Sequence, residues 1–279
     1  MPHHDPLAAA TFHASELAEV DVAAIRAALA THAVARIRGL FDPDGIRALR
    51  DGIAAGFSAA NDRKHDARDT EAVRTNFQKI VVGGITGTDR HRSLARFLRM
   101  LFNPIFAADV YGMRATFVRL ARLRNRLFGL ADDFAVHGTE DGYWTAARIH
   151  QYPRGGGFMV PHRDRYSRMA VVDSGAEYVQ VFLVMSRKGE DFSDGGAFIE
   201  RDGERLFYED ACALGDVMVY DGGVVHGVGD VDPMAPLDLA GFTGRVAAFA
   251  SLYRHLTPGE ADYVTLAKRS QRFDDETGA

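Results

Sequence analysis

The spacing of apolar residues divides the chain into two parts. Before about Gly142, apolar residues recur mainly at helical spacing, as at Leu17, Val20, Ile25 and Leu29. After Gly142, short apolar runs rich in β-branched and aromatic residues alternate with glycine turns. This pattern is typical of an antiparallel sandwich or jelly roll. The runs are WTAARIHQY, YVQVFLVM, AFIE, RLFYE, DVMVYD and RVAAFASLY.

We therefore expect one domain over residues 1–279, mainly β with flanking α. Its predicted parts are a helical part over 1–141, a jelly-roll core over about 142–256 and a C-terminal tail over 257–279. Asp42-Pro43 predicts a helix start, since the Asp carboxylate accepts from free backbone N–H groups and Pro suits the first helical position. The highly charged segment 61–74 is predicted as a loop or lid. Other elements expected in the first part are helices at 15–30, 93–106 and 109–130 and strands at 32–40 and 77–85.

Composition narrows the class of protein. The 279 residues are 47% hydrophobic and 25% charged, as in an ordinary globular protein. A net charge of -5 argues against an electrostatic nucleic-acid binder. The single cysteine, Cys212, excludes an intramolecular disulfide and fits a reducing compartment. No apolar run approaches the roughly 18 residues of a membrane span, and no signal peptide is evident at the start. We expect a soluble, cytoplasmic protein that binds neither nucleic acid nor membrane.

The segment YPRGGGFMVPHRDR contains the most informative pair of side chains. His162 and Asp164 are two residues apart, and on a strand such residues point to the same face. A second histidine, His226, lies far downstream and can come from a neighbouring strand of a folded sheet. Two histidines and one carboxylate on one face of an octahedron are the ligand set of non-haem Fe(II) oxygenases. The remaining positions stay open for a co-substrate and O2.

Glycines and an arginine surround this candidate ligand set in the sequence. Gly195-Gly196 is predicted to open a strand, and Gly215-Asp216 to start the strand that carries His226. Arg245 follows Gly244 within an apolar run. A guanidinium buried there needs an anionic partner, and its planar fork matches a carboxylate. That partner is either a ligand or an acidic neighbour in a structural ion pair.

The order Tyr-x-x-Gly…His-x-Asp…Gly-Gly…Gly-Asp…His…Gly-Arg, over residues 148–254, resembles the Fe(II)/2-oxoglutarate-dependent oxygenase superfamily. The segment ARIRGLFDPDGIRALRDGI is also similar to the entry of phytanoyl-CoA-dioxygenase-like members. The resemblance implies a double-stranded β-helix (jelly-roll) core wrapped by N-terminal helices. It implies that Fe(II) is bound by His162, Asp164 and His226. It further implies that Arg245 pairs with the distal carboxylate of 2-oxoglutarate and that Tyr152 lies near that co-substrate.

The same resemblance implies hydroxylation of an unactivated C–H bond with release of succinate and CO2; ring closure and desaturation use the same ligands and stay open. As substrate we expect a small metabolite, such as an amino acid or a biosynthetic intermediate, with a carrier-bound or CoA-bound molecule as the alternative. Halogenases of this type carry Gly or Ala in place of the carboxylate ligand, so Asp164 favours oxygenation. Arg254 is a second candidate for the 2-oxoglutarate anchor. Arginines near the iron ligands would suit an anionic substrate. Candidates for substrate contact are Arg163, Arg165, Tyr166, Phe77, Gln78 and Arg148.

Two alternatives stay open. A cupin-like metalloenzyme would use the same barrel and iron without 2-oxoglutarate. A non-catalytic jelly-roll binding module would use the three candidate ligands only structurally. The sequence does not predict the oligomeric state. His150 is expected to be structural rather than a ligand, and Tyr152 has core packing as its alternative role. The arginines of 114–126 are expected to form a solvated helix face.

Overall fold

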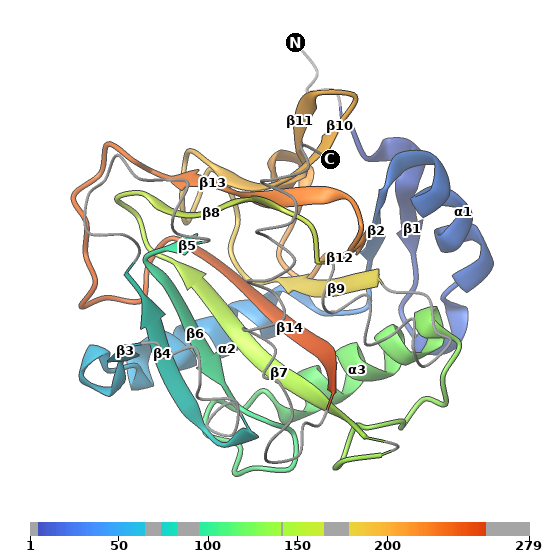
Figure 1. Cartoon of the computed structure of the whole chain (residues 1–279), viewed down its shortest axis with the longest axis horizontal. Helices are drawn as coiled ribbons and strands as arrows, with labels where there is room; N and C mark the ends of the chain where they lie inside the picture. The colour runs from blue at the N-terminus through green and yellow to red at the C-terminus, as the bar shows by residue number, and fades with distance from the viewer. Residues whose placement is uncertain (1–4, 65–73, 83–94, 141, 165–178, 255–279) are drawn as a thin grey trace, which may run out of the picture.

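The computed structural model describes residues 5–64, 74–82, 95–140, 142–164 and 179–254. Within them, two β-sheets face each other (Figure 1). The larger sheet has the order β1 (Thr11–His13), β2 (Val34–Arg38), β12 (Val217–Asp221), β9 (Val179–Val184), β14 (Arg245–Arg254), β7 (Tyr143–Tyr152), β6 (Leu98–Phe102), β4 (Phe77–Val81) and β3 (Arg63–Lys64). The smaller sheet has the order β11 (Glu204–Phe207), β10 (Gly196–Arg201), β13 (Val225–Val231), β8 (Gly157–His162) and β5 (Ala95–Arg96).

From β7 onward the chain passes back and forth between the two sheets. Strands β7, β9, β12 and β14 lie in the larger sheet, and β8, β10, β11 and β13 lie in the smaller one. The neighbouring strands of this group pair antiparallel. The predicted jelly-roll core is therefore confirmed, and each apolar run of the second half forms a strand.

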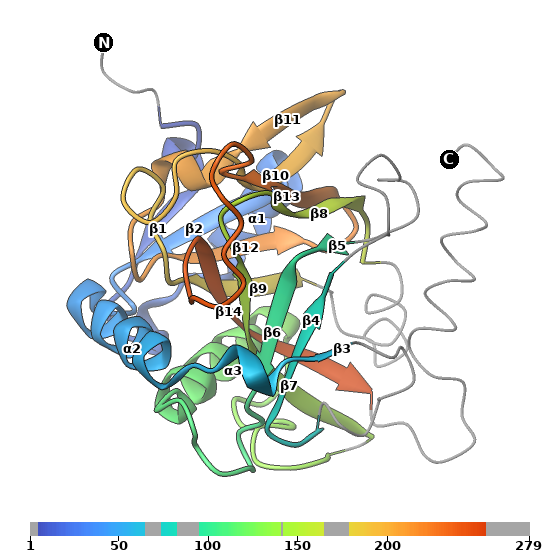
Figure 2. The same cartoon turned by 90° about the vertical axis from the view of Figure 1, so that its left-hand side faces the viewer.

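The larger sheet is covered on both faces, and this explains the composition of its central strands. Along β14, Val246 and Ala248 pack in a cluster with the helices, whereas Ala247 and Phe249 pack against residues of the smaller sheet. Successive side chains of a strand point to opposite faces, so both alternating sets are apolar. Figure 2 shows α2 and α3 on the side of the larger sheet opposite the smaller sheet. The helices are α1 (Val22–His32), α2 (Pro43–Gly56) and α3 (Arg114–Phe128), with 3-10 turns η1 (Ala8–Ala10), η2 (Leu17–Glu19), η3 (Ala59–Asn61) and η6 (Tyr208–Ala211).

Several helices and strands of the first part agree with those predicted from the sequence. Helix α2 begins at Pro43, and the Asp42 carboxylate accepts from the Gly45 backbone N–H at 2.8 Å. The predicted helix at 15–30 is divided into η2 and α1, because the Asp21 carboxylate caps a new helix by accepting from the Ala24 N–H at 2.9 Å. Strands β2 and β4 lie inside the predicted strands, and α3 inside the predicted helix at 109–130.

The helix predicted at 93–106 is wrong within the described residues. Residues 95–96 and 98–102 form strands β5 and β6, which pair with β8 of the smaller sheet and β7 of the larger sheet. Between them Phe97 has a φ of 52°, where the chain changes sheet. The apolar residues of this segment are compatible with a helix or with a strand buried on both faces. Pairing of β6 with β7 selects the strand.

The charged segment 61–74 is only partly described. Its residues Arg63–Lys64 form strand β3 at the edge of the larger sheet, and the rest up to residue 73 lies outside the described residues, as does the tail 257–279. No helix in the described part of the chain is long and apolar enough to cross a membrane.

Candidate metal centre

The structure brings His162, Asp164 and His226 together between the two sheets. His162 ends β8, and His226 lies directly opposite it on the antiparallel strand β13. One ligand atom from each of the three residues lies within 4.8 Å of the others. The Nε2 atoms of His226 and His162 lie 3.4 and 3.7 Å from the Asp164 carboxylate oxygens. This group is called the metal centre below.

Two details of the predicted geometry need correction. The strand that starts after Gly215-Asp216 is β12 of the larger sheet, and His226 lies on the next strand, after a turn. Asp164 lies two residues beyond the end of β8 rather than on it. Its backbone N–H donates to the Gly222 carbonyl at 2.9 Å, which fixes it beside the turn that precedes His226.

Both histidines are held in the same way. The Nδ1 atom of His162 lies 2.9 Å from the Val160 carbonyl oxygen, and that of His226 lies 2.9 Å from the Val224 carbonyl oxygen. Because a carbonyl only accepts, each Nδ1 carries the proton, and each Nε2 is left with a lone pair. Such a backbone partner is the usual orienting contact of a metal-binding imidazole.

The ionisation of the three groups suits a cation. Burial opposes charge on Asp164, but hydrogen bonds and the nearby imidazoles outweigh it, and the pKa of Asp164 lies well below its usual value. Burial and the charge of His226 lower the pKa of His162. The pKa of His226 is raised, because its hydrogen bond and attraction to Asp164 outweigh burial. The centre therefore offers one carboxylate and two imidazoles to a cation.

A hydrogen-bond chain leads from the metal centre into the larger sheet. Gln180 donates from Nε2 to Asp164 Oδ2 at 2.7 Å, and Ser251 Oγ donates to Gln180 Oε1 at 3.3 Å. Arg148 Nη1 donates to Ser251 Oγ at 3.1 Å. The last three residues lie on the neighbouring strands β9, β14 and β7 and are buried. Each donor faces toward Asp164, so the chain fixes the orientation of that carboxylate.

Sequence reasoning missed Gln180 and Ser251 as site residues, and it named Arg148 only as a substrate contact. The available signal was a polar residue inside the apolar runs YVQVFLVM and RVAAFASLY. Such a residue indicates a buried hydrogen bond, because an unpaired polar group costs free energy in a core. Its partner is set by the pairing of β9, β14 and β7, which the runs alone do not specify.

His150 is the neutral acceptor beside Arg148. Arg148 Nε donates to His150 Nε2 at 2.9 Å. Burial, followed by the charges of Arg148, Arg245 and Lys79, holds the pKa of His150 well below its usual value. The structure leaves His150 out of the group of candidate metal ligands.

Arg245 lies deeper in the same interior and already has an acidic partner. It begins β14 directly opposite Tyr152 on β7, and its guanidinium Cζ lies 5.3 Å from the Tyr152 ring centroid. Its Nε and Nη2 atoms bind the Glu209 carboxylate at 2.7–3.0 Å, and both side chains are buried. Glu209 also accepts from the Ala197 backbone N–H at 2.8 Å. A role for Arg245 toward 2-oxoglutarate stays a prediction.

Tyr152 is almost completely enclosed, with 1% exposure. Its hydroxyl donates to Met159 Sδ at 3.8 Å, and burial raises its pKa. Gly244, with a φ of 87°, precedes Arg245, and a Cβ there would collide with the Tyr152 carbonyl. Glycine at this position therefore lets β14 start against the end of β7. The place of Tyr152 beside a co-substrate stays a prediction.

The other predicted contact residues lie elsewhere or are not described. Arg163 is exposed next to the metal centre and donates to the Gly223 carbonyl at 2.6 Å. Gln78 on β4 binds the Ser58 carbonyl and the Asp62 carboxylate. Phe77 is buried on the same strand. Arg165, Tyr166 and the side chain of Arg254 lie outside the described residues.

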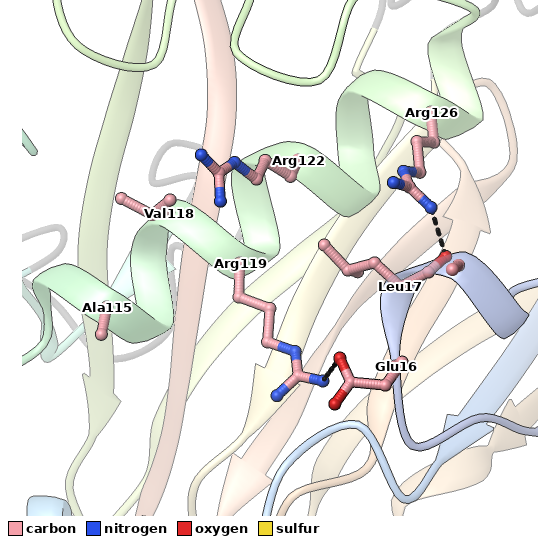
Figure 3. Close-up of a pocket in the computed structure, with 8 residues that line it drawn as sticks. Glu16, Leu17, Ala115, Val118, Arg119, Arg122 and Arg126 are labelled. Carbon is pink, nitrogen blue, oxygen red and sulfur yellow. Dashed lines mark hydrogen bonds and ion pairs between the residues drawn. The ribbon is translucent and has the colours of Figure 1, made fainter.

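A separate surface pocket lies between η2 and α3 (Figure 3). Arg119 points to Glu16 at its rim, and Arg126 donates to the Leu17 carbonyl. Its arginines are neutralised by acids, through Arg119–Glu16, Arg122–Asp133 and Arg126–Asp132. The predicted solvated arginine face holds for these residues but not for Arg124, which is buried.

No protein-family model and no curated protein sequence matches the chain. Solved structures do resemble it. An oxidoreductase of the 2OG-Fe(II) oxygenase family from Burkholderia pseudomallei is 16% identical, with 91% of this chain and 98% of that chain covered and a TM-score of 0.44. A Pseudomonas putida prolyl-4-hydroxylase is 18% identical, with 84% and 98% covered and a TM-score of 0.46. EctD from S. alaskensis, solved with 2-oxoglutarate and 5-hydroxyectoine, is 16% identical, with 82% and 74% covered and a TM-score of 0.44.

Proposed function

We propose that this protein is an Fe(II)- and 2-oxoglutarate-dependent oxygenase. It hydroxylates an unactivated C–H bond of a small metabolite, an amino acid or a biosynthetic intermediate, and releases succinate and CO2. The observation that carries the proposal is the metal centre, in which two imidazole nitrogens and one carboxylate oxygen lie within 4.8 Å of one another. That donor set fits Fe(II) and leaves coordination positions open.

The residues present suit the proposed metal. His162 and His226 direct Nε2 toward Asp164, because their Nδ1 atoms donate to the backbone. Gln180 holds Asp164 Oδ2 by a 2.7 Å hydrogen bond. When bound, Fe(II) would supply the O2-activating chemistry that couples decarboxylation of 2-oxoglutarate to hydroxylation. The carboxylate at position 164 supports hydroxylation over halogenation.

The interior beside the metal centre is suited to an acid. Burial lowers the pKa of His150, and the charges of Arg148, Arg245 and Lys79 lower it further. Glu209 neutralises Arg245, whereas the hydrogen-bond acceptors of Arg148 within the described residues are all neutral. An acidic ligand would suit such a guanidinium. The family resemblance implies that Arg245 binds the distal carboxylate of 2-oxoglutarate and that Tyr152 lies near this co-substrate. For Arg245 this requires that its contact with Glu209 be shared or broken.

The partners we propose are a small-molecule substrate and O2. We also propose a cytoplasmic location, which the single, unpaired and buried Cys212 supports.

An anaerobic titration tests the proposed function. Fe(II) and 2-oxoglutarate should together produce the weak visible charge-transfer band of the chelate, and His162→Ala should abolish it. His137→Ala is the matched control, since that side chain is 64% exposed on the surface and should leave the band unchanged. Stoichiometric metal without a band would support a cupin-like enzyme. No stoichiometric metal would support a non-catalytic binding module.

A further inference from the structure

The hydrogen-bond chain between Arg148 and Asp164 runs in one direction, from a group that only donates to a group that only accepts. Resting on the metal centre of the proposed function, we propose that Arg148 is a positioning residue that strengthens metal binding through Ser251 and Gln180. It makes Gln180 present its amide N–H, and not its carbonyl, to the Asp164 carboxylate. Arg148 thereby acts on a metal ligand from three hydrogen bonds away.

The two ends of the chain leave one arrangement for its protons. A guanidinium only donates hydrogen bonds and an ionised carboxylate only accepts them, whereas the hydroxyl and the amide between them do both. Arg148 Nη1 donates to Ser251 Oγ at 3.1 Å, so the hydroxyl directs its own proton to Gln180 Oε1 at 3.3 Å. The amide nitrogen of Gln180 then lies 2.7 Å from Asp164 Oδ2 as a donor.

Without Arg148, only Asp164 would set this direction. The Ser251 hydroxyl could then accept a hydrogen bond from Gln180, and the amide could turn over and place Oε1 against the carboxylate. Two oxygens at that distance repel each other, and a buried carboxylate without its donor is costly. Donors aligned in one direction also strengthen one another, because each bond polarises the next. Arg148 therefore favours the arrangement that holds Asp164 in place.

Arg148 is itself held in one position by neutral groups. Its Nε donates to His150 Nε2 at 2.9 Å, and its Nη1 also donates to the Ala146 carbonyl at 3.0 Å. The ring centroids of Phe249 and Tyr253 both lie 5.2 Å from its Cζ. These contacts keep the guanidinium from turning away from the chain.

The middle of the chain is protected from water by the pairing of three strands. Arg148 on β7, Ser251 on β14 and Gln180 on β9 are 5%, 6% and 8% exposed. Phe249 of β14 lies opposite Arg148, and Ser251 is two residues further along on the same face of that strand. Hydrogen bonds are stronger in such a buried setting than in water, so an effect at Arg148 can reach Asp164.

A direct effect of the charge of Arg148 would have the opposite sign. A guanidinium repels a bound cation through space, so this effect alone would make metal binding tighter once the charge is removed. The chain instead predicts weaker binding, because Asp164 loses its orientation. The sign of the change in metal affinity therefore separates the two effects.

Titration of the apoprotein with Co(II), followed by its visible spectrum, tests the proposal. Ser251→Ala breaks the chain but keeps the charge, and should raise the Kd for Co(II) about tenfold or more, as for loss of a residue that orients a metal ligand. Ser251→Thr keeps the hydroxyl and should bind normally. Arg148→Met should also raise the Kd, but less, because the repulsion is lost as well. Arg119→Gln, in the pocket beside α3 on the far side of the larger sheet, is the control and should leave the Kd unchanged.

The double variant Arg148→Met/Ser251→Ala gives the decisive comparison. Once the chain is broken, Arg148 retains only its charge, so its removal from Ser251→Ala should leave the Kd unchanged or lower it. Two results would overturn the proposal: a Kd in Arg148→Met at or below the wild-type value, or the same rise from this substitution with and without Ser251. Urea unfolding checks that each variant is folded. A wild-type protein that bound no Co(II) would instead refute the metal centre, and the proposed function with it.

Discussion

The Nε2 atom of Gln180 donates a 2.7 Å hydrogen bond to Oδ2 of Asp164 and so joins the larger sheet to the metal centre. The amide is oriented by Ser251, which donates to its oxygen at 3.3 Å. One carboxylate oxygen of Asp164 is therefore held by the protein beside the two imidazoles.

Gln180→Leu should weaken binding of a divalent metal, because Asp164 then loses the donor that orients it. Removal of such an outer contact typically lowers metal affinity about 10- to 100-fold. Titration of the apoprotein with Co(II), followed by its visible spectrum, measures the change. Equal affinity in a folded variant would show that Asp164 is positioned without Gln180.

Arg245→Met should destabilise the protein strongly. The substitution leaves the Glu209 carboxylate buried and uncompensated, which costs about 3–5 kcal/mol. Urea unfolding gives the free energy of unfolding. Glu209→Gln/Arg245→Met should recover most of the loss, and a single variant as stable as the wild type would contradict a structural ion pair.

Arg148→Met should behave in the opposite way. Without ligand the wild-type guanidinium has only neutral acceptors among the described residues, so its removal should leave the free energy of unfolding unchanged or raise it. Loss of several kcal/mol in the ligand-free variant would indicate a structural role instead.

His150 should make stability depend on pH below its ordinary value of 6.5. Burial, followed by the charges of Arg148, Arg245 and Lys79, lowers the folded-state pKa, so the unfolded chain binds a proton first as pH falls. The contribution of neutral His150 to the free energy of unfolding is complete above pH 6.5. Below pH 6.5 it decreases by up to about 1.4 kcal/mol per pH unit. Urea unfolding of wild type and His150→Gln between pH 5 and 8 isolates it. Parallel curves for the two proteins would refute the prediction.

Gly227→Ala should separate the two strands of the metal centre. A Cβ at Gly227 would lie 2.7 Å from the Met159 carbonyl oxygen on β8 and 2.7 Å from the Phe198 ring. Since Gly227 follows His226, the shift would move a ligand, and we expect weaker Co(II) binding. Gly52→Ala, on α2 with nothing within 4 Å of its Cβ, is the control and should bind normally.

Features of the fold that depend on neighbouring residues could be predicted from the sequence, whereas those that depend on distant contacts could not. The strands of the jelly roll could be predicted because short apolar runs and the glycine turns between them are properties of neighbouring residues. The segment 95–102 was misjudged because its apolar residues satisfy a helix as well as a strand, and its pairing with β7 is a contact across about fifty residues of sequence.

The candidate site shows the same division. The His162–Asp164 spacing was visible, and His226 could be proposed as a third ligand, but only the β8–β13 register places the two histidines face to face. No local signal connected Glu209 in RLFYED with Arg245. That ion pair depends on a fold in which η6 meets the start of β14.

The register of β14 has a consequence for how this chain can vary. Arg245, Phe249 and Ser251 share one face of that strand, and Val246 and Ala248 share the other, against the helices. Inserting or deleting one residue inside β14 would exchange these faces for every residue beyond the change. It would put the Ser251 hydroxyl into the apolar layer under α3 and apolar side chains on the face that now carries Ser251. Length changes are therefore expected to be tolerated in the connection before Gly244, and not within the strand.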